Sequence, residues 1–211
     1  MQTQRVITAV ICIPLLLLLL WLGGWWLALA LAALTAVGGL EYARLVRVMA
    51  RPDAAVWYAA GWLYLVGCFV CFFFGRQLGG FSGALWLLVV IWSTDTAAYE
   101  VGRRIGKHKL APTVSPNKTV EGAVAGIIAA FVIGGGYALL IMDINWISIL
   151  AVPILISAIG QLGDLLESRI KRLAGVKDSG RLFPGHGGVL DRFDSIMLSS
   201  PFMCLFLLII Y

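Results

Sequence analysis

Long apolar stretches alternate with short polar segments along the whole chain. Seven of these stretches approach or reach the roughly 20 residues that a helix needs to cross the hydrocarbon core of a bilayer. They cover residues 6–22, 25–40, 56–74, 81–99, 122–142, 146–165 and 193–211. The pattern predicts an all-α, polytopic helical membrane protein with about seven transmembrane helices.

The composition agrees with a membrane protein. Hydrophobic residues make up 61% of the chain and charged residues only 13%, with a mean hydropathy of +0.94. All four cysteines lie in apolar stretches without a second pair of ligands, which excludes a disulfide framework and argues against a zinc site. The first stretch has no small-residue cleavage site followed by a soluble body, so we expect a retained span rather than a signal peptide.

The basic residues indicate the orientation. With seven spans and the N-terminus inside, every Lys and Arg except Arg76 falls at the inner face, as the positive-inside rule requires. The net charge of +5 therefore lies beside membrane spans and is not interleaved with exposed aromatics. This pattern favours anionic lipid and anionic substrate as partners, and it argues against nucleic acid.

The first polar cluster occupies residues 92–122. Asp95 lies in the inner half of an apolar span among Ser93, Thr94 and Thr96, and an intramembrane Asp is a functional hypothesis by default. The alternative is a hydrogen-bonded cluster that only packs helices. The following GRRIGK segment is one residue short of a nucleotide-binding phosphate loop and follows a membrane span rather than a strand, so we reject that motif.

The same cluster ends in the SPNKT segment, residues 115–119. Pro116 favours a turn there, and its polar neighbours can donate hydrogen bonds to phosphate oxygens. These donors are Ser115, Asn117, Lys118 and Thr119. A solvated loop without a role is the alternative.

The second cluster starts inside the sixth apolar stretch and continues to the start of the seventh, and its acids recur at i,i+3 spacing. Gln161, Asp164 and Glu167 share one helical face, and Asp191 and Asp194 repeat the pattern at the start of the last span. Two carboxylate-bearing helix ends on one membrane face can hold divalent cations, although a solvated acidic stripe is the alternative. Between them, the PGHGG segment at 184–188 predicts a flexible loop that approaches a ligand closely, with His186 as a contact or a simple turn residue.

These motifs carry a resemblance. The segment from Ser168 to Asp194 contains S-x-I-K-R, then K-D-x-G-x-x-F-P-x-H-G-G-V-x-D-R-F-D, and it resembles the signature of the phosphatidate cytidylyltransferases, or CDP-diacylglycerol synthases. Upstream, D-T-A-A-Y from Asp95, S-P-x-K-T-x-E-G from Ser115 and Q-x-G-D from Gln161 are also similar to that family. The likeness covers roughly residues 90–211. One departure is the segment between residues 41 and 95, which is shorter than is usual for the family.

The resemblance implies transfer of CMP from CTP to phosphatidic acid, with release of pyrophosphate, by a Mg²⁺-dependent enzyme that has room for a second cation. The implied metal ligands are Asp164 and Asp191, with Asp194 and Asp95 as further ligands or supporting groups. The implied catalytic set is Asp164, Asp191, Lys118, Lys171 and Arg192. The implied substrate contacts are Ser115, Asn117, Lys118, Thr119, Arg172, Lys177, His186, Gly187 and Gly188.

Residues 1–90 are expected to form a transmembrane scaffold, and residues 91–211 the catalytic region of the same integral domain. A bacterial inner membrane is the expected location, with the active site on the cytoplasmic side, and a homodimer is compatible with the resemblance. Two other functions stay open. One is a related CTP-dependent enzyme that acts on a polyprenol or an ether lipid, and the other is a secondary transporter, which would not need two long basic loops around acidic pairs.

Overall fold

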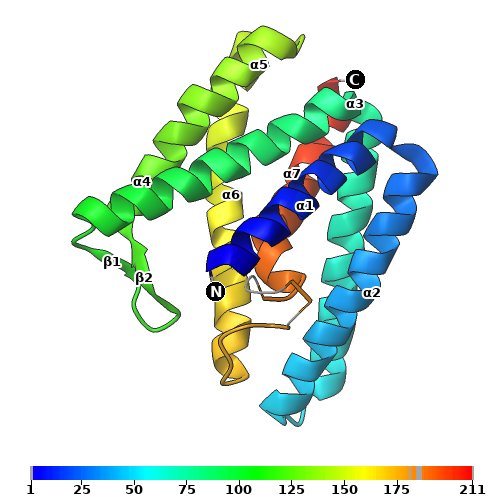
Figure 1. Cartoon of the computed structure of the whole chain (residues 1–211), viewed down its shortest axis with the longest axis vertical. Helices are drawn as coiled ribbons and strands as arrows, with labels where there is room; N and C mark the ends of the chain where they lie inside the picture. Colours follow the sequence, from blue (N-terminus) through cyan, green and yellow to red (C-terminus); the bar gives the residue numbers. More distant parts are fainter. Residues whose placement is uncertain (1, 181, 184–186, 211) are drawn as a thin grey trace.

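Helices form most of the chain, as the sequence predicts (Figure 1). The computed structural model describes residues 2–180, 182–183 and 187–210. The long helices are α1 (Gln2–Leu22), α2 (Gly24–Met49), α3 (Ala54–Ile105), α6 (Trp146–Leu173) and α7 (Leu190–Ile210). Between α3 and α6 lie β1 (Lys109–Ala111), β2 (Ser115–Thr119), α4 (Val120–Ala129), the π-helical turn η1 (Ala130–Gly134) and α5 (Gly135–Ile141).

The helices have the length and composition of membrane spans, which confirms the predicted fold class. Within the described residues, five helical segments are long and apolar enough to cross a bilayer, and α1 adds a shorter apolar part, Val10–Leu22. Helix α3 has 52 residues and bends at Gly80, whose φ of 63° is a conformation that glycine adopts readily. Each predicted span falls on helical residues, and the bend separates the third predicted span from the fourth. The number of seven membrane crossings stays a prediction.

A short β-hairpin interrupts the helical pattern. Strands β1 and β2 pair antiparallel, with Lys109 opposite Thr119 and Ala111 opposite Ser115. The turn that joins them covers residues 112–114, so the prediction of a turn at Pro116 was wrong, because this proline lies inside β2. Strands this short leave no recognisable alternation in the sequence. The hairpin matters for function because it holds the SPNKT segment against α3 and α4.

Helix α7 packs closely against α6 through small residues. A Cβ added at Gly163 would lie 2.7 Å from the backbone oxygen of Asp194, and one added at Gly160 would lie 3.2 Å from the hydroxyl of Ser199. Glycine at these positions lets two membrane helices approach at backbone distance. Their approach brings the acidic end of α6 beside the acidic start of α7.

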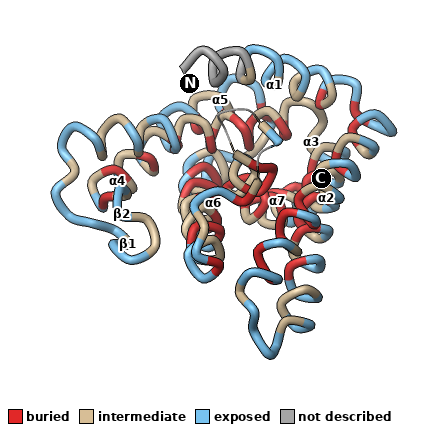
Figure 2. The backbone as a smooth tube through the Cα atoms, turned by 60° about the horizontal axis from the view of Figure 1, so that its bottom comes forward, coloured by how far each residue is buried: buried red, intermediate tan, exposed pale blue. Residues whose placement is uncertain are grey.

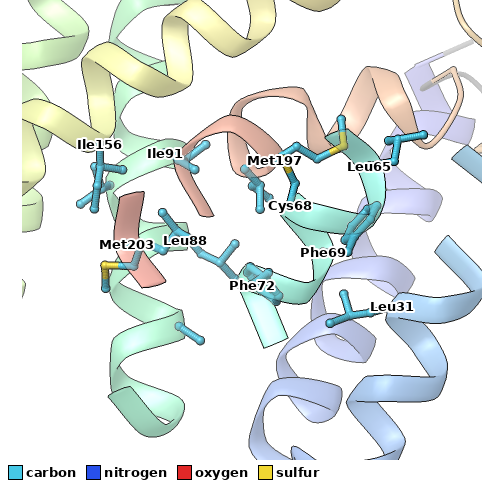
Figure 3. Close-up of a cluster of buried hydrophobic side chains, with 14 of the residues drawn as sticks. Leu31, Leu65, Cys68, Phe69, Phe72, Leu88, Ile91, Ile156, Met197 and Met203 are labelled. Atoms are coloured by element: carbon cyan, nitrogen blue, oxygen red, sulfur yellow. The ribbon is translucent and has the colours of Figure 1, made fainter. Parts of the chain in front are cut away.

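The apolar core gathers α2, α3, α6 and α7. Phe69 of α3 meets Phe193 of α7 in an edge-to-face contact with ring centroids 5.9 Å apart. Figure 3 shows Leu31, Phe72, Ile156 and Met203 among the side chains of this cluster. Burial is concentrated where the helices face one another, whereas the hairpin and the outer helix faces are largely exposed (Figure 2). The core therefore fixes the helices whose inner ends carry the polar residues.

The π-helical turn η1 is tied to the core by Trp86. A π-turn has backbone hydrogen bonds that span five residues instead of four, so it interrupts the regular α-helix. The fully buried indole of Trp86 contacts the last residue of this turn, since its Nε1 donates to the Gly134 oxygen at 2.7 Å. The hydrogen bond fastens the second half of α3 to the span formed by α4, η1 and α5.

Replacing Trp86 with Phe is expected to lower stability by about 1–3 kcal/mol, because the buried hydrogen bond from the indole to the Gly134 carbonyl is then lost. The measurement is thermal unfolding of the detergent-solubilised protein, followed by circular dichroism. Trp25→Phe is the matched control, since Trp25 is 84% exposed. Equal shifts for the two variants would mean that the indole hydrogen bond contributes nothing.

Candidate active site

Two adjoining cavities lie at one end of the helices. The larger, about 580 Å³, is enclosed by α3, the hairpin, the start of α4 and α6. The smaller, about 380 Å³, is enclosed by α3, the hairpin, the end of α6, the α6–α7 loop and the start of α7. Asp95, Asn117 and Asp164 line both cavities. The two polar clusters that lie far apart in the sequence therefore line adjoining cavities.

An ion pair between Lys118 and Asp164 lies between the cavities. Lys118 comes from β2 and Asp164 from α6, and their side chains are 25% and 31% exposed. Asp164 also accepts a hydrogen bond from the Ser168 hydroxyl at 3.3 Å. Because both side chains stay partly accessible, the pair can exchange partners when an anion or a cation enters.

Asp191 is held by four donors. Its Oδ1 accepts from Lys171 Nζ at 2.6 Å. Its Oδ2 accepts from the Ser179 amide and hydroxyl, both at 2.9 Å, and from the Gly188 amide at 2.8 Å. The carboxylate thus fixes the α6–α7 loop against the first turn of α7. The prediction of Asp191 as a leading metal ligand stays untested, but this geometry indicates an organising role.

Lys171 connects Asp191 to a second acid. Its Nζ lies 2.6 Å from Glu167 Oε2, one helical turn earlier on α6, as well as 2.6 Å from Asp191. All three side chains are largely buried, with exposed fractions of 12% for Lys171, 9% for Glu167 and 5% for Asp191. A lysine between two buried carboxylates compensates charges that would otherwise be costly to bury.

Oxygen donors suitable for a magnesium ion line the smaller cavity. Asp95, Asp164 and Asp194 come from three helices, and Asp194 interacts electrostatically with the other two. Among residues 2–180, 182–183 and 187–210, no three His, Cys, Asp or Glu side chains form a ready-made ligand cage. Mg²⁺ usually keeps several waters and takes one or two carboxylates together with substrate phosphates. One or two of these acids would supply the carboxylates for that mode of binding.

Cationic side chains surround the same cavity. Lys177 and Arg192 are exposed and line it, and their contact with phosphate stays a prediction. Arg172 also lines it, but its guanidinium is anchored by Val114 O at 3.1 Å and Val176 O at 3.0 Å. Arg172 therefore joins the hairpin turn to the α6–α7 loop and still offers its charge to the cavity.

The predicted substrate contacts with smaller polar side chains divide into two groups. Ser115 and Asn117 line the smaller cavity, and Asn117 lines both. Thr119 also lines the larger cavity, but its hydroxyl accepts from the Gly122 amide at 3.1 Å and so caps α4.

The loop glycines that were predicted to contact substrate also make hydrogen bonds within the protein. Gly187 pairs with Phe183 through two backbone hydrogen bonds, and the Gly188 amide binds Asp191. The φ of Gly187, +90°, explains the need for glycine there. His186 lies outside the described residues.

Sequence reasoning missed Glu41 and Ser179. Glu41 lies on α2 and is only 3% exposed, and it contacts the α6–α7 loop. The rule that singled out Asp95, an acid within an apolar helix, applies equally to Glu41. The predicted span ended at residue 40, and this boundary made Glu41 look like a loop residue.

Comparison with known proteins identifies the family. The model of the "Cytidylyltransferase family" matches residues 3–78 and 54–210. A phosphatidate cytidylyltransferase of Staphylococcus haemolyticus is 47% identical over 146 residues, which are 68% of this chain and 55% of the relative. One of Bacillus subtilis is 44% identical over 167 residues, which are 78% of this chain and 62% of the relative.

The match is extensive on this chain, although the chain spans less than two thirds of the length of either relative. The family match includes α3, the hairpin, α6 and α7, which together enclose both cavities. It therefore extends over the helices that carry Asp95, Asp164 and Asp191. The chain belongs to the cytidylyltransferase family.

Proposed function

We propose that this protein transfers CMP from CTP to phosphatidic acid and releases pyrophosphate, which gives CDP-diacylglycerol. The observation that carries the proposal is the pair of adjoining cavities with Asp95, Asn117 and Asp164 in their shared lining. Two substrates can be held side by side there, with their phosphates meeting at the shared residues. The family membership and the names of the relatives support the same reaction.

The lining of each cavity favours a different substrate. Lys171, Arg172, Lys177 and Arg192 surround the smaller cavity, which suits the triphosphate of CTP. The larger cavity combines Arg103, Lys109 and Lys118 with apolar side chains of Ala98, Tyr99, Leu110 and Ala123, which suits a phosphate attached to an apolar body. Phosphatidic acid would reach this cavity from the bilayer.

The reaction needs charge neutralisation more than proton removal. An ionised phosphate oxygen of phosphatidic acid attacks the α-phosphorus of CTP, and the bond to the oxygen shared with the β-phosphate breaks, so pyrophosphate leaves with that electron pair. Lys118 lies beside the attacking phosphate, whereas Lys177 and Arg192 neutralise the leaving group. Asp164, together with Asp95 or Asp194, would hold a magnesium ion, and the ion would lower the repulsion between the two polyanions.

The proposed location is a bacterial inner membrane with the site on the cytoplasmic side. Basic residues support this orientation, because the hairpin and the α6–α7 loop carry much of the positive charge next to the cavities. CTP, a cytoplasmic nucleotide, would enter from that side while the lipid arrives from the membrane.

Purified protein with labelled CTP and phosphatidic acid is expected to form CDP-diacylglycerol only when both substrates and Mg²⁺ are present. Excess chelator is expected to reduce the rate at least about 100-fold, because the phosphate charges then lack their main counter-ion. Mass spectrometry identifies the product and separates this reaction from one on a polyprenol or an ether lipid. A full rate in chelator would remove the metal from the proposal, and absence of a lipid product would remove the reaction.

A further inference from the structure

A carboxylate from the N-terminal part of the chain lies inside the α6–α7 loop. Glu41 of α2 accepts three hydrogen bonds, and all three donors belong to residues 179–190, more than 130 positions away. Its Oε1 accepts from the Val189 amide at 3.1 Å, and its Oε2 from the Leu190 amide at 3.2 Å and the Ser179 hydroxyl at 3.1 Å. These three hydrogen bonds join α2 to the loop that also binds Asp191.

Two of these donors belong to the beginning of α7. The first amides of a helix lack partners within the helix, and they carry its positive dipole end. Glu41 supplies the missing acceptor from a neighbouring helix, so the start of α7 is fixed relative to α2. The position of Asp191, the next residue after Leu190, depends on where α7 begins.

Ser179 connects Glu41 to Asp191 directly. Its hydroxyl lies 3.1 Å from Glu41 Oε2 and 2.9 Å from Asp191 Oδ2. A hydroxyl carries a single proton, so it donates to one carboxylate at a time. The two acids therefore share one donor, and a change at either acid alters the hydrogen bonding of the other.

Two glycines of the loop fit around the Glu41 carboxylate. A Cβ added at Gly180 or Gly188 would overlap the carboxylate oxygens of Glu41. Neither position combines a positive φ with this overlap, so the space taken by Glu41 explains the need for glycine there. These two loop residues therefore lie against a carboxylate that α2 provides.

We infer that Glu41 is a positioning residue, which holds Ser179, Gly180 and residues 188–190 so that Asp191 and Arg192 face the smaller cavity. The expected loss of kcat rests on the proposed function, whereas the expected change in amide exchange does not. It also assigns the N-terminal helices a part in the site, since α2 delivers the group around which the loop is arranged.

The test compares Glu41→Gln with the full-length wild type. Glutamine keeps the shape but places an amide N–H₂ against backbone donors, so we expect amide exchange in residues 179–190 to become about 10-fold faster, as measured by hydrogen exchange with mass spectrometry. In the CTP and phosphatidic acid assay, kcat is expected to fall about 10-fold or more while KM for CTP changes less than about 3-fold. Asp53→Asn is the matched control, because Asp53 is an exposed acid bound to Arg51 and Trp57.

Ser179→Ala separates positioning from general support of the fold. If Glu41 acts through the loop, the double variant Glu41→Gln, Ser179→Ala should lose less kcat than the product of the two single losses, because Ser179 also binds Asp191 directly. Independent effects that multiply would overturn the inference, as would unchanged exchange in residues 179–190.

Two further outcomes are covered by the same design. If Glu41→Gln does not fold, the Glu41→Asp variant is measured instead, since aspartate keeps the buried charge but is too short to reach all three donors. Unchanged amide exchange in that variant contradicts the inference. If wild-type protein forms no CDP-diacylglycerol, the proposed function fails, and the exchange measurement still decides the role of Glu41.

Discussion

Replacing Asp191 with Asn is expected to lower kcat/KM at least about 100-fold, on the order of 3 kcal/mol of transition-state stabilisation. The carboxylate accepts from Lys171, from Gly188 and twice from Ser179. An asparagine has one oxygen and one amino group, so at least one set of donors would face another donor. Lys171 would also lose one of its two counter-ions in a largely buried position.

The assay is the one described for CDP-diacylglycerol formation, with Asp53→Asn as the control for an exposed acid. Because Asp191 organises the loop, we expect its Asn variant to show faster amide exchange between residues 179 and 190 as well as lower activity. Activity within about 3-fold of wild type would show that the site does not depend on this carboxylate.

Replacing Asp164 with Asn is expected to have an equally large effect on activity, at least about 100-fold, but a smaller effect on the fold. Asp164 is 31% exposed and binds Lys118 and Ser168, so its loss leaves no fully buried charge without a partner. It would remove the negative charge that a hard cation prefers in a ligand, and it would leave Lys118 without this counter-ion at the point where the cavities meet.

Magnesium titration tests that assignment. If Asp164 is a ligand, higher Mg²⁺ should restore part of the activity of Asp164→Asn, whereas Asp143→Asn, an exposed acid in the α5–α6 connection, should behave like wild type. The double variant Asp164→Asn, Lys118→Gln removes both charges of the ion pair. Recovery of activity in the double variant would mean that Asp164 serves only to neutralise Lys118.

Sequence patterns predicted the helices and most of the polar residues that line the candidate site. Apolar length placed the spans, and the i,i+3 spacing of acids placed Asp191 and Asp194 at the start of one helix. Spacing alone does not say which partner each acid meets. In the structure Asp191 binds Lys171 and the loop, whereas Asp194 lies near Asp164 and Asp95, because close α6–α7 packing decides the neighbours.

Contacts across long separations were beyond the sequence patterns. Glu41 meets partners 138 to 149 positions away, and no local periodicity encodes such a pairing. The Glu167–Lys171 pair is different, since its i,i+4 spacing on one helix follows a known rule and was predictable. The hairpin was missed because strands of three and five residues, one with a proline, carry too little pattern.

The bend of α3 has a consequence for how the protein is reached from its two sides. In Figure 1 the α1–α2 connection, the bend of α3 and the α5–α6 connection lie at one end of the molecule, opposite the α6–α7 loop. These three connections are short, because only Gly23 lies between α1 and α2, α3 continues through Gly80, and only residues 142–145 join α5 to α6. A protease or an antibody applied to that side therefore meets little extended backbone, while cleavage sites and tag insertions belong on the side of the cavities.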